Sequence, residues 1–432
     1  MRRSLPFLAL LLASAPLRAE PGLPDAASVN GALDAHPSVL AAQARVEAAR
    51  ADARARARGT QELTFSGSYT RRSVDREGSF DEYDTQLSRP IRLPGKGRLD
   101  RQVGQFGIEE AENLAEDAKH QAALLLAGHW FDWLGAAAEA EVDRQAVANL
   151  ERTLAAVRRR VELLDAAQLE ADQAAAALGT ARVAEAESAG RAATARGRLV
   201  AHFPALALPQ QAPPVPAPDL PAGGLMSYRD RVLANSHEIA AAQAAAQRMQ
   251  ALAARARMDR MADPSIGVRL FSERDGAERG AGLVFSMPLG GGHRAAVADQ
   301  AAAEANSALA EAALARANVL EVADADLAEA QFRHDAWRLA RAALDAQMAA
   351  LVKLRRGQAL GEIDLADVLL GERSVHDSFR AEAAARTAAL RAITRIRIDS
   401  HALWLADDPA EGAMGALGSA TPYGPPLAAA GK

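Results

Sequence analysis

The sequence contains an internal repeat, in which one structural unit occurs twice. This repeat limits the possible folds more than any other feature. Residues 39–44 read Val-Leu-Ala-Ala-Gln-Ala, and residues 239–244 read Ile-Ala-Ala-Ala-Gln-Ala. Each copy opens an alanine- and arginine-rich helical stretch. Two strand-like runs, a glycine-rich turn and a very long helical segment that breaks partway then follow. The sequence therefore predicts helix, β-hairpin, long helix, reversal and long helix, twice over.

The repeat also predicts how the chain is divided. A proline-rich run between the two copies cannot be helical and is expected to form an extended connector. The last residues are rich in Gly, Pro and Ala, which predicts a disordered tail. The predicted parts are a signal peptide at 1–19, a first repeat at 20–208 with its hairpin at about 62–92, the connector at 209–222, a second repeat at 223–405 with its hairpin at about 264–290, and the tail at 406–432.

The first residues predict export. Arg2 and Arg3 precede a short apolar run, and a small-residue cleavage site ends at Ala19, which together are typical of a secretory signal peptide. The chain has no cysteine, which excludes disulfides, thiolate metal sites and a lipid-attachment cysteine. A formal net charge of −5 argues against nucleic acid as a partner.

The helical segments predict thin, closely packed layers. Aromatic residues make up only 4% of the chain, and its apolar content is mostly alanine. A helix over residues 99–164 would be about 100 Å long, and doubling back at each break gives antiparallel pairs. By themselves such helices favour an alanine-rich coiled-coil rod. Hairpins inserted at the same place in both halves reverse this preference and favour a hollow helical cylinder.

The strand-like runs alternate between apolar and polar residues, as transmembrane β-barrel strands do. Leu63, Phe65 and Tyr69 share one face of the first run, whereas Arg269 lies opposite the apolar face of the third. Two soluble hairpins remain the alternative. Four strands cannot close a barrel, and an open edge in lipid leaves backbone groups unsatisfied. Chains must then pool their strands, and both two chains and three chains would close. The aromatic residues expected to form an interfacial girdle are Phe65, Tyr69, Tyr83, Phe271 and Phe285.

No pattern for catalysis or metal binding stands out. His129, His334, His376 and His401 are scattered, without the i, i+4 spacing of a metal-binding helix. Residues 93–98 contain two glycines and a lysine but lack the frame of a phosphate-binding loop. The sequence therefore predicts a protein that is not an enzyme, with no catalytic or metal site and no cofactor.

Over nearly all of the mature sequence, the chain resembles the TolC-like outer-membrane efflux family. The resemblance rests on the twofold plan, the proline-rich connector and residues 355–370, where Gly361 precedes Asp367-Val368-Leu369. The first repeat has Leu164 where a glycine is common, so its turn can differ. Arg-Arg-Val-Glu-Leu at 159–163 and Leu-Gly-Glu-Ile-Asp-Leu at 360–365 are similar to the branch that accompanies heavy-metal cation pumps.

This resemblance implies a homotrimer in which a 12-stranded transmembrane β-barrel is joined to a periplasmic α-helical barrel. Such a protein lies in the outer membrane, in contact with its lipid, and has a long periplasmic extension. It passively exports small solutes or metal cations. Its partners are a periplasmic adaptor (membrane fusion) protein and an inner-membrane pump of the RND type or similar. The alternatives are a periplasmic coiled-coil adaptor and an exported structural protein.

Charged residues beside the two helix breaks are the candidate functional residues. In a symmetric trimer each acidic residue becomes a ring of three like charges, which attracts cations at a constriction. A solvated helix face is the alternative. The residues expected at the pore aperture are Asp364, Asp367, Glu362, Asp165 and Glu170. The residues expected to form gate or adaptor contacts are Arg158, Arg159, Arg355, Arg356 and Gly361.

Overall fold

The structure is a computed structural model of the chain, and it describes residues 21–221 and 224–405. The predicted signal peptide and the predicted tail lie outside the described residues. The chain divides into two compact units. The sheet unit comprises Asp34–Ala122 and Arg229–Ala325, and the helical unit comprises Met1–Leu33, Ala123–Tyr228 and Asp326–Lys432.

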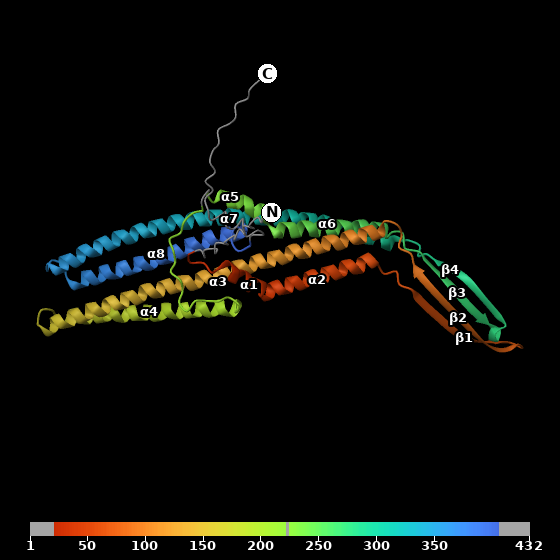
Figure 1. Ribbon diagram of the computed structural model, residues 1–432, viewed down its shortest axis with the longest axis horizontal. Coiled ribbons are helices and arrows are strands. Elements are labelled where there is room, and N and C mark those ends of the chain that lie inside the picture. The colour runs from red at the N-terminus through yellow and green to blue at the C-terminus, as the bar shows by residue number, and fades with distance from the viewer. Residues whose placement is uncertain (1–20, 222–223, 406–432) are drawn as a thin grey trace, which may run out of the picture. The chain divides into compact units, whose positions relative to one another are not determined.

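The predicted fold class is confirmed: the chain is mainly helical with one small antiparallel sheet, and the same order of elements occurs twice (Figure 1). The first repeat contains α1 (Ala26–Asp34), α2 (Pro37–Arg58), β1 (Thr64–Val74), β2 (Gly78–Pro90), α3 (Lys96–Glu162) and α4 (Gln168–His202). The second contains α5 (Met226–Asn235), α6 (His237–Met258), β3 (Ser265–Glu273), β4 (Glu278–Ser286), α7 (Gly292–Ala359) and α8 (Leu365–Asp399).

A short helix, α1 or α5, precedes the helix that the sequence predicts at the start of each repeat. Capping side chains separate the two helices. The Nδ1 atom of His36 accepts a hydrogen bond from the backbone N–H of Ser38, and the Oγ atom of Ser236 accepts one from the N–H of Ile239. Such caps satisfy N–H groups that have no partner within the helix. Both repeats therefore begin with the same helix–cap–helix arrangement.

The long helices form antiparallel pairs in the helical unit, with α3 beside α4 and α7 beside α8 (Figure 1). Between α3 and α4 the contact is made by small and medium-sized side chains, among them Val147, Leu154, Ala174 and Leu178. Alanine allows two helices to approach closely because it adds little volume to the interface. The alanine-rich composition therefore produces thin helical layers, as the sequence predicts.

Helix α8 ends at Asp399, before the predicted limit of 405. His401 has a φ of 58°, and the N–H of Ala402 bonds to the carbonyl of Arg397 at 2.8 Å. A left-handed residue with this hydrogen bond terminates a helix. The prediction missed this end because the left-handed residue is a histidine and not the glycine that usually marks such a turn.

The two hairpins form one four-stranded sheet in the order β1-β2-β3-β4. All pairs are antiparallel, and β2 pairs with β3 so that Leu87 lies opposite Val268. Strands β1 and β4 are therefore the two edges, and neither has a second partner strand within the described residues. In the part of the chain that the structure describes, no helix is both long and apolar enough to cross a membrane.

Candidate functional site

The turns that join α3 to α4 and α7 to α8 have the same backbone geometry. Asp165 N–H bonds to the carbonyl of Arg160 at 2.8 Å, and Glu362 N–H bonds to that of Gly357 at 3.0 Å. Leu164 has a φ of 60° and Gly361 a φ of 77°. This is the arrangement in which a left-handed residue closes a helix end. The leucine in the first repeat therefore does not change the turn.

The acidic residues of the α7–α8 turn are exposed. Asp364 caps α8: its Oδ1 atom accepts a hydrogen bond from the N–H of Asp367 at 2.9 Å. The neighbouring Leu365 and Val368 are buried and hold the first turn of α8 in place. Among the described residues, no ion pair involves Glu362, Asp364 or Asp367. This turn therefore presents three carboxylates whose charge no nearby cation balances.

The negative charges of the acidic residues in the α3–α4 turn are partly balanced by an arginine. Arg160 contacts Asp165 at 2.9 Å and Glu170 at 3.6 Å. Glu170 also accepts a hydrogen bond from the N–H of Ala167 at 3.4 Å. One guanidinium thus neutralises part of the charge at this turn. The two turns share their backbone geometry but differ in electrostatics.

Arg160 was missed by the sequence analysis, although the repeat carries a signal for it. The repeat places Gly357 at the position that corresponds to Arg160, and Ile363 at the position that corresponds to Ala166. Ile363 packs over Gly357, where an added Cβ would lie 2.6 Å from its Cδ1 atom. A side chain at 357 would therefore clash, whereas the smaller Ala166 leaves room for the arginine.

The predicted gate arginines make only local contacts or none. Arg159 pairs with Glu162 at 2.9 Å, and Arg355 pairs with Glu372 at 2.8 Å. Within the described chain, neither Arg158 nor Arg356 takes part in an ion pair, and both are exposed. No bridge between the two repeats forms at these residues. Their role in a gate or in adaptor contacts stays a prediction.

An apolar cluster brings the two turns to the same end of the helical unit. Val157 of α3 and Ala171 of α4 pack against Leu365 of α8, with Val161 and Leu369 beside them. The balanced and the unbalanced acidic residues are therefore close neighbours in the fold, although the two turns are far apart in sequence.

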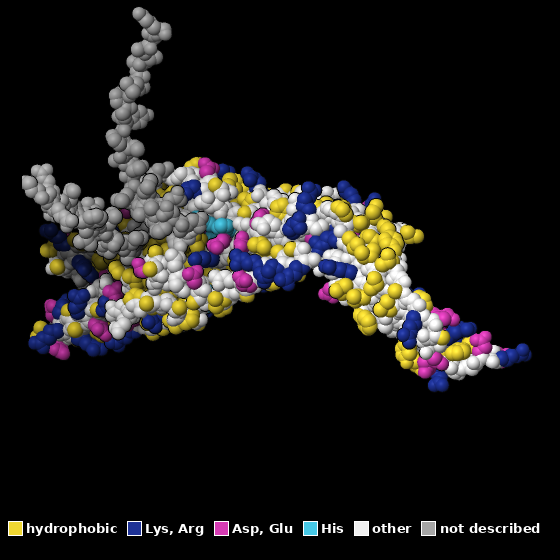
Figure 2. Space-filling view, turned by 45° about the vertical axis from the view of Figure 1, so that its right-hand side comes forward, with side chains coloured by type: hydrophobic (Ala, Val, Ile, Leu, Met, Phe, Trp, Pro, Cys, Tyr) yellow, Lys and Arg dark blue, Asp and Glu magenta, His cyan; other side chains and the backbone are white. Residues whose placement is uncertain are grey.

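One face of the sheet is apolar in successive rows. Antiparallel partners share a face, so the pairing places Phe65, Leu87, Val268 and Leu283 in one row. The next row toward the helices contains Ile266 and Phe285, and also Arg89 of β2. Figure 2 shows hydrophobic side chains gathered near the helix end of the sheet and charged ones near its far end. The rings of Tyr69 and Tyr83 lie 5.3 Å apart, tilted against each other, where the apolar rows end.

The opposite face of the sheet is mainly polar. Arg269 lies on it, as the sequence predicts, and pairs with Asp84 of β2. Arg72 pairs with Glu82 at 2.6 Å. The prediction for Phe271 is wrong: it neighbours Leu270 in β3 and therefore points to the polar face. Its ring covers Gly280 of β4 there.

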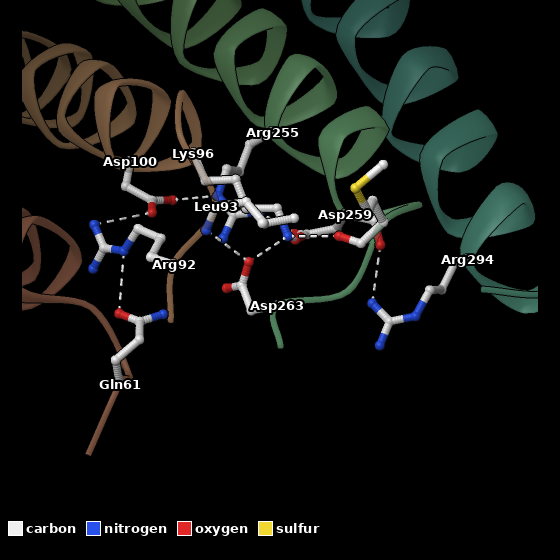
Figure 3. A network of polar contacts seen from close by, with 10 residues as sticks. Gln61, Arg92, Leu93, Lys96, Asp100, Arg255, Asp259, Asp263 and Arg294 are labelled. Carbon is white, nitrogen blue, oxygen red and sulfur yellow. Dashed lines mark hydrogen bonds and ion pairs between the residues drawn. The ribbon is translucent and has the colours of Figure 1, made fainter. Parts of the chain in front are cut away.

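A network of charged residues joins the sheet to the helices in the sheet unit (Figure 3). The Lys96 side chain is only 1% exposed, and its Nζ atom lies 2.9 Å from Asp259 and 2.8 Å from Asp263. Arg255 pairs with Asp100 at 2.7 Å and also with Asp259. The network connects the start of α3 in the first repeat to the end of α6 in the second. It therefore holds the two hairpins in a common position.

Hydrogen bonds and charge set the acidity of these carboxyl groups. Burial is the largest single influence on Asp259 and Asp263, and by itself it would raise the pKa of both. Hydrogen bonds from Arg255 and Lys96 to Asp259, and from Lys96 and the Leu93 N–H to Asp263, outweigh burial and lower the pKa of each. Both carboxyl groups therefore stay charged at neutral pH.

The histidines are distributed over separate contacts. His376 lies 2.7 Å from the buried Asp143, and the rings of His129 and His202 stack at 4.7 Å. The described residues contain no group of three or more side chains placed to hold a metal ion. The helix turns and the sheet faces are thus the features of the described chain that carry a functional argument.

Comparison with known proteins gives a consistent result. Residues 29–202 match the family model described as outer membrane efflux protein. Comparison with curated protein sequences finds no match. Similar solved structures are CusC (18% identity, 87% of this chain, 91% of that chain, TM-score 0.74), VceC of Vibrio cholerae (17%, 87%, 95%, 0.68) and the open state of MtrE of Neisseria gonorrhoeae (18%, 87%, 88%, 0.69).

These solved structures, at identities below a quarter, share the fold of the chain. The family model supplies the sequence relation, and it matches the first repeat, which the second repeat duplicates. Residues 29–202 are thus related in sequence to outer membrane efflux proteins, and the chain as a whole has the fold of these solved channel structures.

Proposed function

We propose that the chain is the outer-membrane channel of a tripartite efflux system. It is a passive conduit that exports small solutes or metal cations. The observation that carries the proposal is the division of the four-stranded sheet into an apolar and a polar face. Strands with this division face lipid on one side and water on the other when they form a transmembrane barrel.

The length of the apolar face fits a bilayer. It extends from Tyr83 in β2 to Ile91 just after the strand, with Arg89 near its end, and the Ile91 N–H bonds to the carbonyl of Pro264 at 2.7 Å. A tilted transmembrane strand needs roughly 9–11 residues, and this stretch has that length. Tyr69 and Tyr83 end it, as interfacial aromatic residues do. Arg269 on the opposite face then lines water.

Closure of the barrel requires several chains. The edges β1 and β4 carry backbone groups that lipid cannot satisfy, so each must pair with a neighbouring copy. Two copies supply eight strands and three supply twelve, and the family favours three. The helical unit of each copy then contributes to the periplasmic wall of the conduit.

The turns α3–α4 and α7–α8 are the proposed contact region for a periplasmic adaptor protein, which connects the channel to an inner-membrane pump. Leu164 is 94% exposed with the exposed Leu163 next to it, and Leu360 is exposed in the α7–α8 turn. Exposed leucines are typical of protein contact surfaces when they gather in one place. The pump supplies the energy, so the chain itself performs no catalysis.

The acidic α7–α8 turn is the proposed aperture. Glu362, Asp364 and Asp367 have no balancing cation, so three copies give closely spaced negative rings. Asp165 and Glu170 contribute less because Arg160 compensates them. The aperture therefore favours cations over anions, and the acidic residues responsible belong to the second repeat.

Ion selectivity in planar bilayers tests the proposal. The double variant D364N/D367N removes two charges, while Asn at 364 keeps the helix cap that Ala would lose. We expect the cation-to-anion permeability ratio to fall. R160Q exposes the charge of Asp165 and Glu170 and should raise the ratio, whereas R158Q, without an ion partner, is the matched control.

Two results would count against this assignment. Unchanged selectivity in both D364N/D367N and R160Q removes the turns from the pore. A processed chain that forms no conductance and stays in the water-soluble fraction overturns the channel itself and favours a periplasmic adaptor or a structural protein.

A further inference from the structure

Two carboxyl groups lie buried at the base of the α7–α8 pair, at the end away from the acidic turn. Asp326 of α7 is 9% exposed and Asp399, the last residue of α8, is 5% exposed. Their side chains hydrogen-bond to each other. An apolar cluster that includes Ala330 and Ile396 packs beside them. Neither residue has a part in the proposed conduction.

This contact requires a proton. Two carboxylates offer only acceptor oxygens, so a hydrogen bond between Asp326 and Asp399 forms only when one of them is protonated. The Nε atom of Arg395 lies 2.9 Å from Asp326 and 3.7 Å from Asp399. One guanidinium therefore faces two acids. The buried cluster is electrically neutral when the two acids hold one proton between them.

Several other charged groups nearby form pairs of their own. Leu225, just before α5, and Tyr228 of α5 pack on this region, and of the two only the tyrosine can ionise. His401 is buried just beyond the end of α8. The neighbouring pairs are Asp324 with Arg229 of α5, Glu329 with Arg333 on α7, and Asp132 of α3 with Arg391 of α8. The charged partners of Asp326 are therefore Asp399 and Arg395.

Burial raises the pKa of Asp326, and the hydrogen bond and charge of Asp399 raise it further, to about 7. Arg395 acts in the opposite direction but does not outweigh them. The same burial that isolates the pair from water thus favours its protonated form. The shared proton is held in mildly acidic solution and released near neutrality.

We propose that Asp326 and Asp399 form a proton-dependent clasp that holds the bases of α7 and α8 together. Loss of the proton leaves two carboxylates facing one guanidinium in a buried place. Their repulsion loosens the contact of Ala330 with Ile396, and the α7–α8 pair gains freedom at its base. The clasp goes beyond the proposed conduction and does not depend on it, since it concerns how one helix pair responds to pH.

The sign of the pH effect follows from the raised pKa. An aspartate in an unfolded chain has a pKa of about 3.9. Between about pH 4 and pH 7 the folded protein therefore binds more protons than the unfolded chain. The free energy of unfolding falls as pH rises through this window and levels off above it.

Thermal unfolding of the full-length protein in detergent, measured from pH 4 to pH 8.5, tests the clasp. D326N and D399N each replace a carboxyl by a neutral amide, so the fall in Tm through the window should be smaller than in the wild type. D324N is the matched control. Arg229 lowers the pKa of Asp324 by its hydrogen bond, so this variant should keep the fall.

A second variant separates a proton switch from a merely structural contact. R395Q removes the cation that favours the charged form, so the midpoint of the pH-dependent fall should move to higher pH. Amide exchange of residues 392–399, corrected for the intrinsic effect of pH, should rise through the same window in the wild type and stay flat in D326N. The proposal is overturned if D326N and D399N keep the wild-type profile. It is also overturned if R395Q lowers Tm equally at every pH without moving the midpoint.

Discussion

At the scale of single residues, Leu164 occupies a backbone region that favours glycine. Its φ of 60° places it in the left-handed region, where a side chain costs about 1 kcal/mol relative to glycine. Gly361 holds the same place in the second repeat with a φ of 77°. An exposed leucine gains nothing from burial that could offset this strain. A contact with another protein is the simplest reason for the chain to keep it.

Exchanging these residues gives opposite effects on stability. L164G should raise the free energy of unfolding by about 1 kcal/mol, and G361A should lower it by a similar amount, because only the glycine tolerates the turn without strain. Thermal unfolding in detergent measures both. Equal effects of the same sign in the two variants would contradict the account of the turns.

The positive charge of the buried Lys96 side chain offsets the negative charges of Asp259 and Asp263. K96M leaves Asp259 and Asp263 facing each other without it. Breaking a fully buried pair costs about 3–5 kcal/mol; we expect about 2–3 kcal/mol because both acids keep some exposure to water. K119M, which removes a more exposed pair with Asp34, is the control and should cost under about 1 kcal/mol.

K96M should also change how the stability of the protein depends on pH in acid. The lowered pKa of Asp259 and Asp263 means that their contribution to stability is present above about pH 4 and is lost as pH falls through the folded-state pKa values. The wild-type protein should therefore lose stability in acid more steeply than K96M. Parallel acid unfolding curves would show that Lys96 does not set these pKa values.

At the scale of elements, the strand register decides which side chains share the apolar face of the sheet. Alternation along each run is visible in the sequence, but the apolar face becomes continuous only because Leu87 pairs with Val268 and Val268 with Leu283. A shift of one residue would place Arg269 among the apolar residues. The two hairpins therefore form the apolar face jointly.

Neighbouring positions on β4 test the two faces. Leu283 is 91% exposed on the apolar face, and Gly282 lies on the polar face with open space around its Cα. L283R should reduce membrane insertion, because an arginine facing the bilayer centre costs about 2–4 kcal/mol. G282R should insert normally. The yield of protein in purified outer membranes distinguishes them, and equal yields would show that the faces are assigned wrongly.

At the scale of the whole molecule, the proposed barrel needs more than one chain. Its sheet ends in two open edges, and a single copy supplies only four strands. The physics of lipid requires closure but does not set the number of copies. Native mass spectrometry of the detergent-extracted protein should show three chains. A stable two-chain species would instead indicate an eight-stranded barrel.

Much of this organisation was predictable from local patterns. The repeat predicts the duplicated order of elements, the alternation predicts the residues on the apolar face of β1, β3 and β4, and the acidic residues beside the breaks predict the exposed turn at Asp364 and Asp367. Periodicity and turn chemistry act over a few residues, so they can be read directly from the order of the amino acids.

The tertiary structure alone decided the contacts between residues far apart in sequence. Lys96 meets Asp263, and Asp326 meets Asp399, only after the helices and hairpins pack. Burial then changes the acidity of these groups, and no local pattern reports burial. The ion pairs of Arg160 could not be predicted either, although its partners are close in sequence. They depend on how the turn between α3 and α4 folds back. The local order of the amino acids determined the helices and strands. Tertiary packing determined which charged groups meet and how their pKa values shift.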